Sequence, residues 1–125
     1  MITMARFPFA RIDGVELAPA LVDVARANFL RLGLDQCTMF LRDAAAFADL
    51  DDYTLVFLFH PFSDDVLGRV LGHVAQSLDA RPRRLRLVYE NPVGEPRILA
   101  TGRFRRVLDY HPYEEFRICV YESSE

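Results

Sequence analysis

The sequence predicts an α/β protein, a three-layer sandwich whose mostly parallel sheet ends in an antiparallel hairpin. Apolar segments rich in β-branched residues alternate with segments whose apolar residues recur every three or four positions. This alternation of strands and helices is the pattern that builds parallel sheets. Two strand-like segments then follow one another near the end of the chain, which is typical of a closing hairpin.

The first half of the chain contains the first of these alternations. Residues 9–17 read as a strand, and Ala18-Pro19 opens a helix because proline is tolerated in a first turn. Gly33 is expected to end that helix, and residues 37–41 form the next strand. The connection over residues 44–52 allows one short helical turn. The predicted apolar stripe of the helix consists of Leu21, Val22, Ala25, Phe29 and Leu32.

The second half begins with a segment, residues 53–59, that is nearly all apolar and reads as a central strand covered on both faces. Ser63 is a helix N-cap, followed by two aspartates in the first turn. A strand over residues 85–89 and one helical turn within residues 94–102 come next. The last two strands, residues 104–110 and 116–121, are expected to be joined by His111-Pro112-Tyr113. The predicted stripe of the longer helix consists of Val66, Leu67, Val70, Leu71, Val74 and Leu78.

Length and composition indicate one soluble domain over residues 1–125. The net charge of −3 excludes a strongly basic nucleic-acid-binding surface, and all fifteen basic residues are arginine. No apolar run approaches a membrane span, and the first residues do not resemble a secretory signal. Cys37 and Cys119 lie in predicted strands and read as buried apolar residues. We therefore expect a cytoplasmic protein with no membrane association.

A family resemblance rests on three segments of the sequence. Residues 7–19 combine an apolar strand, Gly14, an apolar residue, Glu16 and the start of an alanine-containing helix. The strand-end sequences Phe59-His60-Pro61-Phe62 and Tyr89-Glu90-Asn91-Pro92 follow later. Together with the order of elements, they resemble class I, Rossmann-like methyltransferases that use S-adenosylmethionine, in particular a bacterial subgroup. The resemblance covers about residues 7–122.

The resemblance also implies where a cofactor would bind. Glu16 matches the acidic residue that holds the ribose hydroxyls, because a carboxylate can accept both hydroxyl protons. Asp43 and Ala44 match the residues that border the adenine. Residues His60, Pro61 and Phe62 match the segment beside the methyl-transfer site, although His60 stands where close relatives have Asn.

The sequence departs from this family at its beginning. Members start with a strand and a Gly-x-Gly loop that lies against the cofactor, and nothing before Phe9 matches them. The resemblance therefore implies a truncated, incomplete methyltransferase fold in which binding of S-adenosylmethionine is lost or weakened. The absent strand would leave apolar edges at residues 12–17 and 55–59. A homodimer that covers the exposed sheet is the preferred solution; direct closure of the sheet in a monomer and a foreign partner are the alternatives.

Two further functions remain open from the residues alone. Glu16, Asp43, His60 and Asn91 all follow strands, and in a parallel sheet such residues converge on one crevice. They could be remnants of a cofactor pocket or the site of a small hydrolase acting on phosphate or carboxylate esters. In that second case His60 and Asp43 would be the catalytic residues, with or without a divalent metal. The third possibility is a non-enzymatic assembly module that completes its sheet with another chain.

Overall fold

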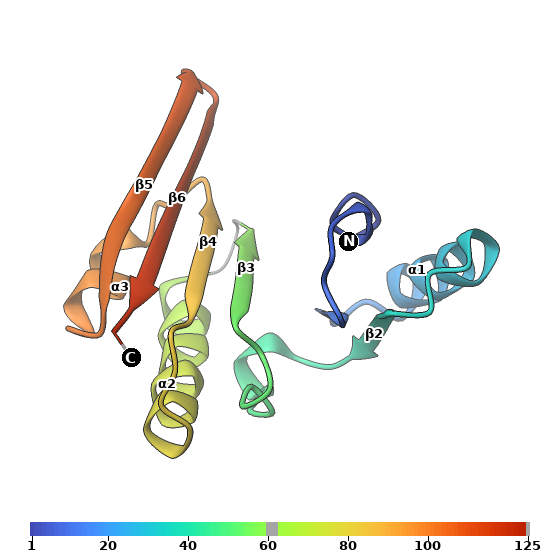
Figure 1. The fold of residues 1–125 in the computed structure, drawn as a ribbon, viewed down its shortest axis with the longest axis horizontal. Coiled ribbons are helices and arrows are strands. Elements are labelled where there is room, and N and C mark those ends of the chain that lie inside the picture. Colours follow the sequence, from blue (N-terminus) through green and yellow to red (C-terminus); the bar gives the residue numbers. More distant parts are fainter. Residues whose placement is uncertain (60–62, 125) are drawn as a thin grey trace. The chain divides into compact units, whose positions relative to one another are not determined.

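The computed structural model of the protein describes residues 1–59 and 63–124. The chain separates into two compact units, Met1–Phe47 and Ala48–Glu125. Each unit contains its own sheet and its own helices (Figure 1), and each is described by itself below. The predicted α/β class is confirmed, with parallel strand pairs in both units and an antiparallel hairpin at the end of the second.

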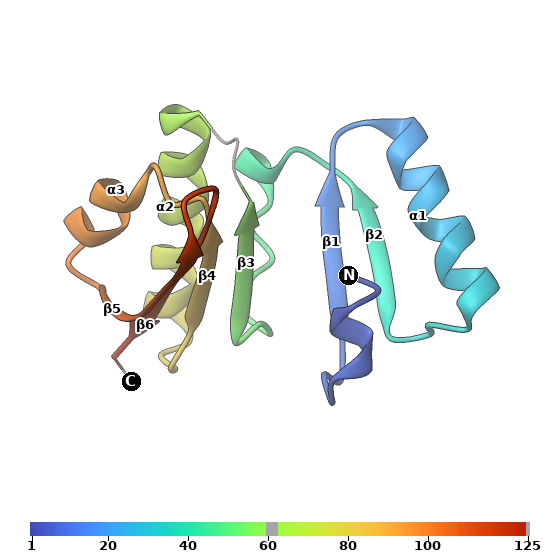
Figure 2. The same ribbon diagram turned by 90° about the horizontal axis from the view of Figure 1, so that it is seen from above.

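The N-terminal unit is one strand–helix–strand motif. Strands β1 (Ile12–Glu16) and β2 (Cys37–Leu41) are parallel, and α1 (Pro19–Leu32) joins them (Figure 2). Pro19 occupies the first turn of α1, as expected. Gly33 ends the helix with φ 64°, a left-handed conformation in which its N–H bonds the carbonyls of Phe29 and Leu30. Short 3-10 helices, η1 (Met4–Arg6) and η2 (Ala44–Ala46), flank the motif.

The core of the N-terminal unit is small. Ile12, Phe29 and Cys37 are buried at its centre, and methionines from η1 and β2 pack around them. The predicted stripe of α1 is wrong in part, because Leu21 is 58% exposed and Leu32 is 49% exposed. Within this unit, α1 packs on a sheet of only two strands, and the contact is too narrow to bury a full apolar stripe.

The C-terminal unit contains a four-stranded sheet of order β3-β4-β6-β5. Strands β3 and β4 are parallel, whereas β6 is antiparallel to both of its neighbours. Ser63 caps α2 as predicted, its Oγ accepting the N–H of Val66 at 3.2 Å. The elements in chain order are β3 (Leu55–Phe59), α2 (Asp64–Ala80), β4 (Arg86–Glu90), α3 (Glu95–Ala100), β5 (Phe104–Tyr113) and β6 (Phe116–Ser123).

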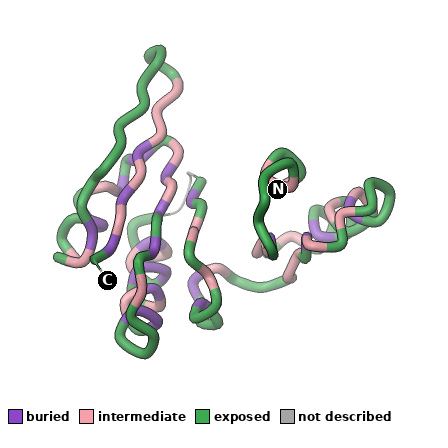
Figure 3. The backbone as a smooth tube through the Cα atoms, in the orientation of Figure 1, coloured by how far each residue is buried: buried purple, intermediate pink, exposed green. Residues whose placement is uncertain are grey.

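Both helices of the C-terminal unit lie on the same face of its sheet. The Tyr89 hydroxyl, from β4, accepts the N–H of Gly94 just before α3, and Leu67 of α2 packs against the same glycine. Cys119 is fully buried in this core, as predicted, and Figure 3 shows the buried segments gathered where the sheet meets α2. The largest fully buried side chains of this unit are Tyr89, Tyr121, Leu67, Leu85, Leu87, Ile98, Val74 and Cys119.

The closing hairpin is longer than predicted. The expected turn at residues 111–113 is wrong, since these residues continue β5 and the turn lies at Glu114-Glu115. Proline has no backbone N–H to donate. Pro112 is compatible with a strand here because β5 is an edge strand, whose outer side has no neighbouring strand that needs this hydrogen bond. Nine of the ten residues of β5 are exposed (Figure 3).

Strand β3 differs from the expected central strand covered on both faces. It lies at the edge of its sheet, and among the described residues it pairs with β4 alone. Phe57 is 44% exposed and Phe59 is 57% exposed. Strand β1 likewise pairs only with β2 within the described part of its unit. None of the described helices is long and apolar enough to cross a membrane.

Candidate functional site

The carboxyl ends of β1 and β2 bring two of the predicted site residues together. The strands are parallel and in register, with Glu16 opposite Leu41, and the Arg42 N–H donates to the Glu16 carbonyl at 3.1 Å. Asp43 follows directly and starts η2. Both carboxylates therefore stand at the same edge of the N-terminal sheet, as the order of the strands predicts.

Glu16 is held by the start of the helix that follows it. Its Oε1 accepts the backbone N–H of Ala18 at 3.2 Å, and the residue is half-buried. This bond fixes the carboxylate next to the first turn of α1, where the helix dipole favours negative charge. A carboxylate offers about four acceptor positions, so Glu16 keeps capacity for further donors such as hydroxyl groups.

Asp43 is positioned by a similar local bond. Its Oδ1 accepts the N–H of Ala45 at 2.9 Å, and its carbonyl accepts the N–H of Ala46 at 3.0 Å. The residue is exposed, while Ala44 beside it is half-buried. Asp43 is thus the cap of η2, and an ionised carboxylate has acceptor capacity beyond this one bond.

An aromatic cluster next to Asp43 was not predicted from the sequence. The rings of Phe40 and Phe47 lie 5.8 Å apart, and the guanidinium of Arg42 lies 5.7 Å and 5.9 Å from their centroids. These separations suit cation–π attraction. Phe40 lies in β2 and Arg42 follows the end of this strand two residues later, a spacing that the sequence shows. Phe47 is brought to them by the short helix η2, a contact that the sequence does not reveal.

The other predicted site residues belong to a different part of the chain. His60, Pro61 and Phe62 lie outside the described residues. Asn91 belongs to the C-terminal unit, where it has φ 52° and its N–H donates to the carbonyl of Arg117 at 2.9 Å. Asparagine tolerates this left-handed conformation better than most residues. Within the N-terminal unit the structure brings Glu16 and Asp43 to one edge of the sheet, and the convergence of all four strand-end residues stays a prediction.

The residues that the structure describes contain no group of three or more His, Cys, Asp or Glu side chains that could hold a metal ion. A metal-assisted hydrolase would need such a group or close equivalents. The hydrolase alternative thus receives no support from the geometry of these residues.

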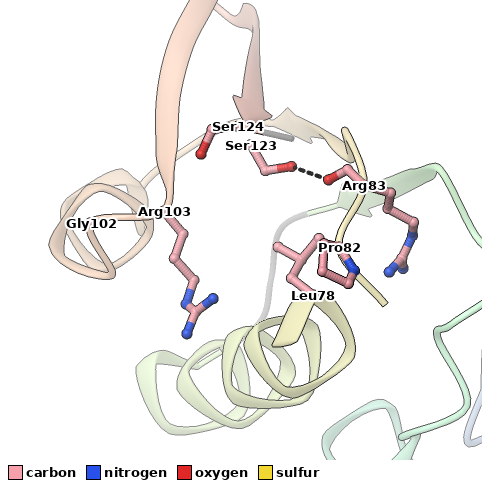
Figure 4. Close-up of a pocket in the computed structure, with 7 residues that line it drawn as sticks. All are labelled: Leu78, Pro82, Arg83, Gly102, Arg103, Ser123 and Ser124. Atoms are coloured by element: carbon pink, nitrogen blue, oxygen red, sulfur yellow. Dashed lines mark hydrogen bonds between the residues drawn. The ribbon is translucent and has the colours of Figure 1, made fainter. Parts of the chain in front are cut away.

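A pocket of about 240 Å³ lies in the C-terminal unit (Figure 4). The Arg83 guanidinium donates to the carbonyls of Leu50 and Tyr53, and Arg103 pairs with Asp79 at 2.8 Å. Both cations are therefore engaged by the protein itself, and the pocket contains none of the predicted cofactor residues. Its lining residues are Leu78, Pro82, Arg83, Gly102, Arg103, Ser123 and Ser124.

Comparison with solved structures assigns the fold. No protein-family model matches the sequence, and no curated protein matches it either. A candidate tRNA (m1A22) methyltransferase from Streptococcus pneumoniae in complex with S-adenosyl-L-methionine superposes with a TM-score of 0.71 at 20% identity, over 99% of this chain and 60% of that one. The fold is that of class I methyltransferases.

Two further methyltransferase structures agree. Magnesium protoporphyrin IX methyltransferase from Synechocystis PCC 6803, with bound S-adenosylmethionine, gives a TM-score of 0.69 at 17% identity, over 98% of this chain and 64% of that one. A candidate methyltransferase from Escherichia coli gives a TM-score of 0.68 at 12% identity, over 93% of this chain and 66% of that one. The chain thus spans less than two thirds of these three methyltransferases, and at such identities the likeness describes the methyltransferase fold alone.

Proposed function

We propose that this chain is a methyltransferase-like domain whose N-terminal unit recognises the adenosine part of S-adenosylmethionine. The observation that carries the proposal is the adjacency of Glu16 and Asp43 at the carboxyl ends of two parallel strands, in a fold shared with methyltransferases that bind this cofactor. When bound, S-adenosylmethionine supplies an activated methyl group. The residues of this chain would hold its nucleoside.

The donor and acceptor chemistry of the two carboxylates fits a nucleoside. Glu16 is half-buried and oriented by Ala18, which suits it to accept the ribose hydroxyls. Asp43 is fixed by Ala45 and would accept from the exocyclic amine of adenine. Ala44 is small enough for an aromatic ring to approach the backbone beside it.

We propose that this recognition is weak. The 125 residues contain no Gly-x-Gly sequence, and such bare loops allow close approach of a ligand to the backbone. The chain would then bind the adenosine part of the cofactor without comparable contacts to its methionine part. The geometry of the site supports nucleoside recognition more directly than it supports methyl transfer.

The proposal is tested by titrating S-adenosylmethionine into the ¹⁵N-labelled chain and following the backbone amide resonances. We expect saturable shifts around residues 16 and 42–45, with a dissociation constant up to about 1 mM, equivalent to about −4 kcal/mol. Glu16→Gln should weaken binding by about tenfold, because it removes a charge-assisted acceptor. Asp35→Asn, an exposed change in the same unit, is the matched control and should bind as the unchanged chain does.

Two results would refute the proposal. One is the absence of any shift at millimolar ligand, and the other is equal affinity of Glu16→Gln and the unchanged chain. Adenosine alone serves as a second ligand. If it binds as well as S-adenosylmethionine, the recognition is confined to the nucleoside, as proposed.

A further inference from the structure

One face of the C-terminal sheet carries a continuous apolar row. Phe57 of β3 is paired with Val88 of β4, Val88 with Val120 of β6, and Val120 with Leu108 of β5. The alternate residues of these strands face α2 and α3, so this row lies on the opposite face, which we call the open face. Among the described residues of the unit, no helix lies on it.

The apolar row is partly in contact with solvent. Phe57 is 44% exposed and Leu108 is 50% exposed, while the two central valines are half-buried by their neighbours. A row of large apolar side chains that crosses a whole sheet is typical of a surface that another protein layer covers. Two sheets that pack face to face lie about 10 Å apart and interlock such rows.

The two ends of the open face carry opposite charge. At one end, Arg86 and Arg105 flank the carboxylate of Glu122, at 3.0 and 3.8 Å. The hydrogen bond from Arg86 lowers the pKa of Glu122, and these three side chains together carry one net positive charge at neutral pH.

The other end of the open face is acidic. Glu90 ends β4 there, opposite Ile118. The hairpin continues past it to a turn made of Glu114 and Glu115, so three carboxylates lie toward this end. Their charge is opposite to that of the Arg86 end.

We infer that the open face is the surface through which two copies of this chain associate. A two-fold axis parallel to the sheet and perpendicular to its strands would lay the apolar row of one copy on that of the other. The same axis makes the strands of the two copies run in opposite directions. The arginine end of each copy then lies over the glutamate end of the other copy. The surface is therefore complementary to itself, which is the requirement of a two-fold interface. A lipid surface fits less well, since charged residues of both signs interrupt the face.

The mass of the full chain in solution is the first test. Sedimentation across a concentration series from about 1 to 100 µM should show a species of twice 14.4 kDa. Leu108→Glu places a charge in the middle of the apolar row on an edge strand, and should raise the dissociation constant by about 100-fold. Leu99→Glu, on α3 and 43% exposed, is the matched control and should leave the dimer intact.

Exchange of charges tests the orientation of the two copies. Arg86→Glu and Glu90→Arg should each weaken the dimer by about tenfold, because each sets like charges against each other. The double variant should regain the original affinity within a factor of about three. The two residues stand at opposite ends of β4, about 13 Å apart, so recovery can come only from contacts between copies.

Three outcomes would overturn the inference. The first is a single-chain mass at the highest concentration, which would leave the open face to a different partner. The second is a dimer that Leu108→Glu does not weaken, or that Leu99→Glu weakens equally. The third is a double charge variant that stays dissociated while its circular dichroism matches that of the unchanged chain.

Discussion

Arg117 and Asp109 form a two-pronged ion pair across the β5–β6 hairpin. The Nε and Nη2 groups of Arg117 donate to the two carboxylate oxygens of Asp109, each at 2.9 Å. Such bidentate hydrogen bonds between a guanidinium and a carboxylate are among the strongest that side chains make. The hydrogen bond from Arg117 lowers the pKa of Asp109 to about 2, helped by a hydrogen bond from Cys119 and the nearby charge of Arg106, against a smaller opposing effect of burial.

The first prediction concerns the pH dependence of stability. Because the pKa of Asp109 is lower in the folded chain than in the unfolded one, its contribution is present above about pH 4 and is lost as the pH falls toward 2. Asp109→Asn should therefore lower the urea midpoint at pH 6 and leave it almost unchanged at pH 2. A difference from the unchanged chain that is equal at both pH values would contradict this assignment.

The second prediction concerns the buried hydroxyl of Tyr121. It donates to Glu95 at the start of α3, and its pKa is raised by burial and by this bond. Tyr121→Phe should lower the free energy of unfolding by about 1.5 kcal/mol, the usual worth of a hydrogen bond to a charged group. Tyr113→Phe, at a residue 60% exposed, is the control and should change stability by less than about 0.5 kcal/mol. Equal urea midpoints for the two variants would refute the prediction.

The third prediction concerns Arg83, whose guanidinium binds backbone carbonyls that no strand or helix satisfies. It donates to Leu50 and Tyr53 at 2.8 Å each. Lysine lacks the planar fork, so Arg83→Lys should destabilise the chain by about 2 kcal/mol in chemical denaturation. Arg69→Lys changes an exposed i, i+4 pair with Asp65 and should cost less than about 0.5 kcal/mol. The assignment fails if the two lysine variants unfold at the same denaturant concentration.

The fourth prediction compares two glycines that have open space where a side chain would be. Gly33 has φ 64°, so Gly33→Ala should destabilise the chain by about 1 kcal/mol through backbone strain alone. Gly72 lies within α2 in helical conformation, and Gly72→Ala should stabilise it by about 1 kcal/mol. Thermal melts of the two variants should thus shift in opposite directions, and a shift of the same sign would contradict the argument.

Local chemistry explains which elements the sequence predicted well. Residues 37–41 form the expected strand, Ser63 is the expected cap and Gly33 ends the first helix as proposed, because each depends on neighbours within a few positions. The predicted position of the hairpin turn is wrong because proline is typical of turns, whereas Pro112 lies within β5. Whether a proline can stay in a strand depends on that strand being at an edge, which only the assembled sheet decides.

Burial was harder to predict than secondary structure. Leu21 follows the periodicity of a buried stripe, and Phe57 lies in an apolar strand, yet both are largely exposed. A pattern shows which residues could be buried together, whereas the neighbouring layers decide which of them are. The same holds for the site: Glu16 and Asp43 could be placed together from strand order, while the contact of Phe47 with Arg42 depends on the path of η2.

Among the described residues β3 is hydrogen-bonded along one side, to β4, and this divides its backbone amides into two populations. In a strand, successive N–H groups alternate in direction, so every second one in β3 points toward β4 and the others point to the free side. The first set of amides should exchange slowly in heavy water and the second set quickly. Slow and fast exchange should therefore alternate along the five residues of β3. A strand that paired with β3 on this side would erase the alternation, so deuterium uptake at β3 reports directly on whether another strand pairs there.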